Sequence, residues 1–81
     1  METNMNFGQA IEAMREGKRV ARNGWNGKGM WIYIVKDFFV EGSKQKFSPA
    51  IVMKTAGGDH QPGWLASQPD MLANDWSVAV D

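Results

Sequence analysis

The sequence predicts an α+β fold, with a small antiparallel sheet, an N-terminal helix and a short second helix before the last strand. Three observations carry this prediction. An amphipathic helical pattern opens the chain, several short β-rich runs separated by glycine-bearing turns follow it, and a helix-start motif precedes a final alternating segment. Because the 81 residues show no repeat, low-complexity tract or linker, we expect one domain over residues 1–81, with residues 1–5 flexible.

The N-terminal helix has a clear start and a clear end. Asn6 and Gln9 have the spacing of a capping box, in which each side chain binds a backbone amide at the other residue. Gly17 is suited to the C-terminal cap. Apolar residues recur between them at helical spacing, which indicates core packing and no chemistry: Phe7, Ala10, Ile11 and Met14.

Two strands are expected next. Residues 18–22 alternate charged and apolar side chains, as a strand with one solvated face does. Residues 30–35 are β-rich and apolar on both faces, which predicts a central strand covered from two sides. In so small a chain, we expect the second cover to come from another subunit.

The middle of the chain contains a further strand and two ambiguous pieces. Residues 47–54 predict a strand in which Pro49, near the start, does least harm to the hydrogen-bond ladder. Phe38 and Phe39 stand between polar residues and predict either a short edge strand or a lid. The glycine-rich residues 56–63 predict a loop.

A short helix and a closing strand complete the expected fold. Ser67 is an N-cap candidate, Pro69 suits an early helical position, and Asp70 completes a capping-box variant. We expect this helix to run through Ala73. Residues 76–80 then alternate as the last strand.

Composition limits the function classes. Nine Lys or Arg balance nine Asp or Glu, whereas binding to a long nucleic acid requires a basic excess, so we expect no such partner. No apolar run approaches the ~20 residues that span a bilayer. With no cysteine and one histidine, neither disulfides nor a structural metal can support the thin core, so we expect a homo-oligomer. The lack of cysteine and of an export-type segment predicts a cytoplasmic protein.

Catalytic groups are sparse. His60 lies in the glycine-rich segment beside Asp59, an adjacent pair that does not predict a metal site. Asp70 and Asp75 could serve general acid–base catalysis, but their positions at a helix start and a strand entry explain them more simply. We therefore expect no enzymatic activity, no cofactor and no metal.

Recognition residues are abundant. Trp31 and Trp76 lie in predicted strands, which indicates the core or a subunit interface, whereas Trp25 and Trp64 lie in turn segments. A loop indole can stack on a nucleobase. Around Trp25, two cations could meet phosphates and two amides could bind a base or ribose edge: Arg22, Lys28, Asn23 and Asn26. Alternatively, Trp25 plugs the end of the sheet and Arg22 pairs with Asp75. The residues leave both readings open.

Three segments together resemble a known family. Residues 6–14, residues 20–30 and residues 64–76 are similar to the second Thoeris anti-defence family, which comprises small phage and prophage proteins. The resemblance extends from Asn6 to Val80 and is weakest over residues 36–63.

This resemblance implies a sponge in the cytoplasm of the infected host. Such proteins sequester the cyclic ADP-ribose derivative made by a bacterial immune sensor without cleaving it. Members form homotetramers with pockets between subunits, and some hold cyclic di- or trinucleotides at a separate site.

The resemblance also assigns roles to residues. Trp25 would be a stacking surface, Asn26 a hydrogen-bonding group, and Arg22 and Lys28 phosphate neighbours. Asp75 would either touch the ligand or orient Arg22 from behind. The second motif would supply an aromatic and polar wall: Trp64, Ser67, Gln68, Asp70 and Asp75.

Two other classes of function remain as alternatives. A protein-binding inhibitor of a host factor would use the tryptophans as interface anchors. A cyclic nucleotide hydrolase would act through Asp70, Asp75 or His60.

Overall fold

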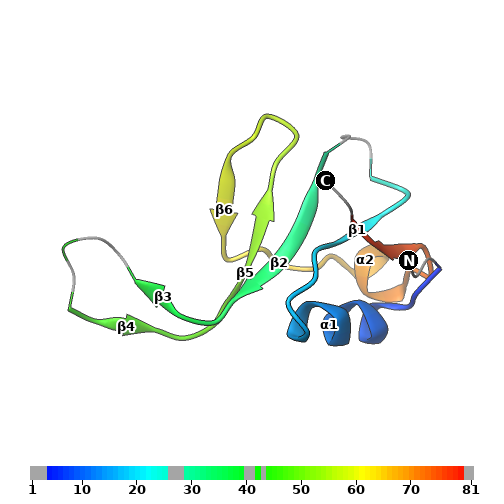
Figure 1. Cartoon of the computed structure of the whole chain (residues 1–81). Helices are drawn as coiled ribbons and strands as arrows, with labels where there is room; N and C mark the ends of the chain where they lie inside the picture. Colours follow the sequence, from blue (N-terminus) through cyan, green and yellow to red (C-terminus); the bar gives the residue numbers. More distant parts are fainter. Residues whose placement is uncertain (1–3, 26–28, 40–41, 43, 80–81) are drawn as a thin grey trace.

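The computed structural model describes residues 4–25, 29–39, 42 and 44–79. Two helices and seven strands occur within these residues (Figure 1). Their order is α1 (Phe7–Arg15), β1 (Val20–Arg22), β2 (Trp31–Val35), β3 (Phe38–Phe39), β4 (Lys46–Phe47), β5 (Ala50–Lys54), β6 (His60–Pro62), α2 (Gln68–Leu72) and β7 (Trp76–Val78).

Five of the strands form one antiparallel sheet in the order β6-β5-β2-β1-β7. Helix α1 packs against β1, β2 and β7, and α2 packs against α1. The α+β class, the antiparallel sheet and both helices are therefore as predicted.

The core lies between α1 and the sheet. Its fully buried side chains are Met14, Val20, Ile32 and Trp76, and Ala10 also has no exposed surface. The predicted capping box at Asn6 and Gln9 is present, and Gly17 follows the helix with a φ of 92°, a conformation that glycine adopts without strain. The start, the end and the apolar stripe of this helix are thus confirmed.

Met5 corrects one expectation. Its side chain is buried, and its backbone exchanges two hydrogen bonds with Trp76, at 2.8 and 3.1 Å. The segment expected to be flexible therefore does not include Met5, because its apolar side chain completes the core beside the last strand. Residues 1–3 lie outside the described residues.

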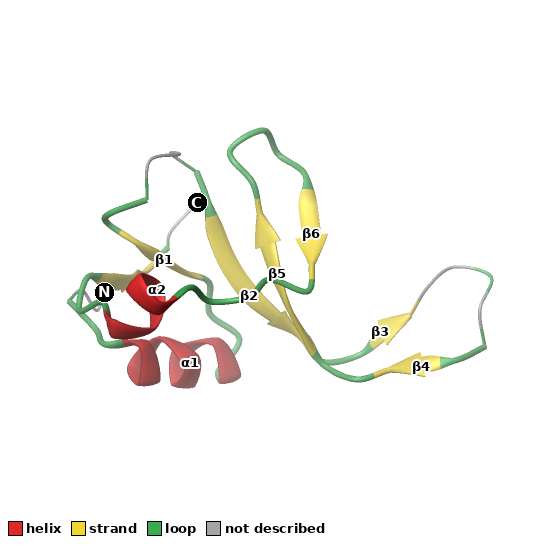
Figure 2. Ribbon diagram, turned by 180° about the vertical axis from the view of Figure 1, so that it is seen from behind, coloured by secondary structure: helices red, strands yellow, loops and turns green. Residues whose placement is uncertain are grey.

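The middle of the chain forms a hairpin arm, defined as residues 36–39, 42 and 44–49. Strands β3 and β4 pair with each other, with Phe38 opposite Phe47, and make a two-stranded sheet of their own. Figures 1 and 2 show this arm projecting from the body beyond the ends of β2 and β5. The radius of gyration, 13.0 Å, exceeds the ~12 Å expected for a compact chain of this length.

The arm also corrects the predicted strand over residues 47–54. That segment is interrupted at Ser48 and Pro49, so β4 belongs to the arm and only β5 belongs to the main sheet. Proline has no amide hydrogen and cannot continue the ladder. The strand at Phe38–Phe39 is confirmed, but it pairs with β4 and does not edge the main sheet.

Strand β6 is a third correction, because the sequence predicts a loop over residues 56–63. The turn after Lys54 closes with a hydrogen bond of 2.8 Å from the Thr55 amide to the Asp59 carbonyl, which brings residues 60–62 back along β5. Because β6 is an edge strand, Pro62 is tolerated there.

Strand β2 is central, as predicted, but only one of its faces is covered by helices. Ile32 is fully buried on the helix side, whereas Trp31 and Tyr33 alternate with it and are half-buried on the other side. Cover from another subunit remains a prediction.

Candidate functional site

Arg22 is the centre of a charged network at the end of β1. Its Nε donates to Asp75 Oδ1 at 2.9 Å, and its Nη1 donates to Asp70 Oδ1 at 2.8 Å. All three side chains are largely shielded from solvent. The ion pair of Arg22 with Asp75, which one of the two sequence readings required, is therefore present, and Asp70 is a second partner that the sequence did not predict.

Local structure fixes both carboxylates. Asp70 belongs to the predicted capping box of α2, because its Oδ2 accepts from the Ser67 amide at 3.1 Å and its own amide donates to Ser67 Oγ at 3.2 Å. Asp75 precedes β7, and its Oδ2 accepts from the Gly24 amide at 2.9 Å. The network thus ties α2 and the start of β7 to the turn after β1.

Gly24 fits this network because it lacks a side chain. A Cβ at this position would lie 3.0 Å from Asp75 Oδ2 and 3.3 Å from Arg22 Nη2. The first distance is tighter than most real Cβ contacts, so the Asp75 carboxylate would have to shift by a few tenths of an ångström to admit a larger residue.

The network shifts the pKa of each member toward its charged form. Hydrogen bonds to Asp70 and Asp75 raise the pKa of Arg22. Burial alone would raise the pKa of Asp70, but hydrogen bonds from Arg22, Ser67 and Trp25 together lower it. The hydrogen bond from Arg22 lowers the pKa of Asp75. At neutral pH, one guanidinium therefore faces two ionised carboxylates.

This charge balance changes the role expected for Arg22. The three side chains carry a net charge of −1, and two of the guanidinium nitrogens already donate to carboxylates. Arg22 is therefore a poor phosphate ligand in this arrangement and is suited to positioning Asp70, Asp75 and the elements that carry them.

Three tryptophans pack beside the network. Trp25 and Trp64 lie edge to face with a centroid distance of 6.2 Å, and each also meets the fully buried Trp76, at 5.3 and 6.3 Å. Such tilted pairs are the favoured aromatic geometry. Trp25 and Trp64 are half-buried, so each packs one part on the core and leaves the rest accessible.

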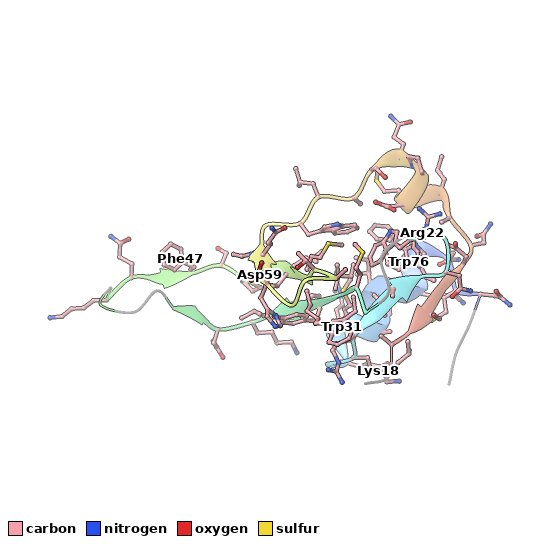
Figure 3. All side chains as sticks on the ribbon, turned by 90° about the horizontal axis from the view of Figure 1, so that it is seen from above. Lys18, Arg22, Trp31, Phe47, Asp59 and Trp76 are labelled. Carbon is pink, nitrogen blue, oxygen red and sulfur yellow. The ribbon has the colours of Figure 1, made fainter. Side chains whose placement is uncertain are left out.

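Hydrogen bonds orient two of these rings. The Nε1–H of Trp25 donates to Asp70 Oδ1 at 3.3 Å, and that of Trp76 donates to the Asp70 carbonyl at 3.0 Å. Figure 3 shows Arg22 and Trp76 close together at the end of the molecule that carries α2. We call Arg22, Trp25, Trp64, Asp70 and Asp75 the tryptophan–carboxylate site.

The structure brings most of the predicted site residues together. Ser67 joins the site through Asp70, whereas Gln68 is exposed on α2. Asn26 and Lys28 lie outside the described residues. Trp25 packs on the core, as the structural reading required, while stacking of a ligand on its accessible part remains a prediction.

The opposite face of the sheet holds a second aromatic group that the sequence did not predict. Arg19 Cζ lies 5.0 Å, and Lys54 Nζ 4.3 Å, from the ring centroid of Trp31. Lys54 also donates to the Gly29 carbonyl at 2.8 Å, and the Tyr33 hydroxyl lies 2.5 Å from Nδ1 of His60. Trp76 is in the core as expected, but Trp31 is not in the core cluster.

A shallow depression of about 380 Å³ lies on this face, lined by Gly17, Arg19, Trp31, Tyr33, Ile34 and His60. No group of three or more His, Cys, Asp or Glu side chains is placed to hold a metal ion in the part of the chain that the structure describes. None of the described helices is long and apolar enough to span a membrane.

The hydrogen bond between Arg22 and Asp70 is a contact that the sequence did not predict. Arg22 and Asp70 are 48 positions apart, and no spacing rule connects them. The sequence did indicate each local motif, the strand end at Arg22 and the helix cap at Asp70. It also marked both segments as candidate binding segments, because Trp25 and Trp64 lie in turns.

The fold and the site define a small α+β domain with a partly exposed pair of tryptophans beside a charged network. A family model described as a Thoeris anti-defense 2-like domain matches residues 5–79. The protein named Thoeris anti-defense 2 of Bacillus phage SP01 is 38% identical over 88 aligned residues, covering 96% of this chain and 98% of the phage protein. The chain belongs to the Thoeris anti-defense 2 family, which confirms the resemblance found in the sequence.

Proposed function

We propose that this anti-defence protein binds and sequesters cyclic nucleotide immune signals, cyclic ADP-ribose derivatives foremost, and releases them unchanged. The observation that carries the proposal is the tryptophan–carboxylate site, in which Trp25 and Trp64 are half-exposed and held edge to face. An indole that stacks on a nucleobase contributes ~1–3 kcal/mol per base. Sequestration of cyclic di- or trinucleotides belongs to the same proposal.

Preorganisation supports a binding role. Trp25 is fixed by its hydrogen bond to Asp70 and by two ring contacts, and Asp70 is fixed in turn by Arg22. Side chains that are ordered before binding lose little entropy when the ligand arrives. Tight binding follows from such a surface without any covalent step.

The chemistry of the carboxylates argues against the hydrolase alternative. A general acid near neutral pH needs a raised pKa, whereas Asp70 and Asp75 have lowered pKa values and accept hydrogen bonds from Arg22. Their geometry suits hydrogen bonding to hydroxyl or amino groups of a ligand. We therefore propose a binder that is not an enzyme and uses no cofactor.

The phosphates of such a ligand require positive charge from elsewhere, because Arg22 is neutralised within the site. Lys28, four residues after Gly24, is one source in the sequence. A neighbouring subunit is another, and we propose a homotetramer, acting in the host cytoplasm, whose binding pockets lie between subunits.

A thermal-shift panel tests the proposal. The protein is heated with cyclic ADP-ribose isomers and with cyclic di- and trinucleotides, and any ligand that stabilises it is recovered by heat denaturation and chromatography. Stabilisation with intact ligand supports sequestration, and a new product supports hydrolysis. If no cyclic nucleotide stabilises the protein, the result favours the alternative function, a protein-binding inhibitor of a host factor.

Two variants locate the site within this experiment. Trp64→Leu removes half of the aromatic pair without touching the Arg22 network, so the ligand-induced shift should be lost. Trp31→Leu, on the opposite face of the sheet, is the matched control and should keep the shift.

A further inference from the structure

The turn after β1 contains a chemically labile pair of residues. Asn23 is exposed and is followed by Gly24. The backbone nitrogen that follows an asparagine can attack Cγ of the asparagine side chain, which closes a succinimide ring and expels ammonia. Water then opens one of the two ring carbonyls and leaves aspartate or isoaspartate. Glycine favours this reaction because no Cβ shields its nitrogen.

The charged network favours glycine at this position. A Cβ on Gly24 would lie 3.0 Å from Asp75 Oδ2 and 3.3 Å from Arg22 Nη2, so a larger residue would crowd the ion pair. The network is therefore best served by the residue type that makes the preceding asparagine most reactive.

The same network restrains the nitrogen that would react. The Gly24 amide donates to Asp75 Oδ2 at 2.9 Å. Ring closure removes the proton from this nitrogen, so it must break the hydrogen bond and place negative charge beside a carboxylate. Two further backbone hydrogen bonds hold the turn on either side. The Asn23 amide donates to the Asp75 carbonyl at 3.1 Å, and the Trp25 amide donates to the Arg22 carbonyl at 3.3 Å.

We propose that Asn23 is a modification site, at which succinimide formation is suppressed while Asp75 holds the Gly24 amide and proceeds when that hydrogen bond opens. Isoaspartate adds one carbon to the main chain before Gly24. The turn then cannot keep its hydrogen bonds to Arg22 and Asp75 together. Modification therefore loosens the tryptophan–carboxylate site, whichever ligand that site binds.

Peptide mapping tests the suppression. The parent protein is incubated at mildly alkaline pH, once folded and once in urea, and fragment-ion mass spectrometry follows the conversion of Asn23. We expect conversion to be about 10- to 100-fold slower in the folded protein, the effect of one hydrogen bond to a charged group. Asn26, which also precedes a glycine, is the reference for the reaction in urea. Equal rates at Asn23 in both states would overturn the proposal, as would an inert Asn23 in urea that converts Asn26.

Two variants separate the hydrogen bond from general stability. Asp75→Asn removes the charge that holds the Gly24 amide and should speed the conversion of Asn23 in the folded protein. Asp70→Asn is the matched control, because Asp70 shares Arg22 but accepts nothing from Gly24, and it should stay closer to the parent rate. Circular dichroism establishes that both variants are folded. Equal acceleration would overturn the proposal, and if Asp75→Asn does not fold, the two rates of the parent protein decide.

The modified protein gives a second readout. Deamidated chains, separated by ion exchange, should unfold at a lower temperature than the parent. Asn23→Asp is the control for the change of charge, since it keeps the length of the main chain and should unfold closer to the parent. An isoaspartate form as stable as the parent would contradict the loosening of the site. No measurement here uses a nucleotide, so failure is distinct from failure of the proposed sequestration.

Discussion

The two faces of the sheet hold their tryptophans by opposite electrostatic means. On the helix side, Trp25 donates to Asp70 within a network that carries net negative charge. On the other side, Arg19 and Lys54 place positive charge over the ring of Trp31. The comparison shows that an exposed indole alone does not define a site, because its hydrogen-bonded neighbours decide what it can bind and how firmly it is held.

The two faces should differ most in the unfolding free energy that is lost when the central cation of each face is removed. Arg22→Met leaves two part-buried carboxylates without their partner and should lower the free energy of unfolding by about 1–3 kcal/mol. Arg19→Met on the other face loses a partly exposed cation–π contact of ~0.5–1 kcal/mol. Urea unfolding measures both. Equal losses would show that the network is no stronger than the cation–π contact.

Acid should weaken the helix-side network selectively. The folded-state pKa values of Asp70 and Asp75 are lowered, so their stabilisation is complete above the unfolded value of ~4 and is lost as the pH falls through the folded values. Unfolding free energies measured from pH 6 to pH 2 should therefore fall below about pH 4. Asp75→Asn should flatten this fall, and an unchanged slope would exclude Asp75 as a contributor.

A smaller effect is expected at the turn that closes the network. Gly24→Ala places a Cβ against Asp75 Oδ2, so the carboxylate must move, and we expect a loss of ~1–2 kcal/mol in unfolding free energy. Gly57→Ala, in the turn between β5 and β6, is the control, because its nearest contact is an ordinary 3.9 Å to Thr55 Oγ1. Equal losses in the two variants would show that the close approach at Gly24 is unimportant.

The smallest effect concerns Lys54. Lys54→Met removes its charge from Trp31 and its hydrogen bond to the Gly29 carbonyl, and should cost ~1 kcal/mol or less. Because this face is open to solvent, part of the loss should disappear in high salt. A loss as large as that of Arg22→Met would contradict the contrast between the two faces.

Local signals in the sequence were sufficient to predict the helices but not the contacts between residues far apart in the chain. Both capping boxes depend on residues three positions apart, so Asn6–Gln9 and Ser67–Asp70 could be predicted. Strand β6 could not, because its pairing with β5 depends on a turn that overrides the loop character of a glycine- and proline-rich segment. Likewise, the splitting of residues 47–54 depends on the arm leaving the main sheet.

In the candidate site too, the sequence predicted the residues from local signals but not the long-range contacts between them. Its residues were selected because indoles lay in turns, and the pairing of Arg22 with Asp75 was one of the readings considered. The sequence did not reveal that Asp70 shares the guanidinium, nor that this sharing leaves Arg22 unsuited to phosphate. That conclusion depends on the positions of three charged groups from separate elements.

Calorimetric titration compares the two faces directly. The cyclic nucleotide that stabilises the protein most is titrated into the parent protein, Trp64→Leu and Trp31→Leu. We expect Trp64→Leu to weaken binding about 5- to 150-fold, the equivalent of one stacked base, and Trp31→Leu to bind as the parent does. Binding that is lost in Trp31→Leu and retained in Trp64→Leu would exclude the tryptophan–carboxylate site as the ligand site.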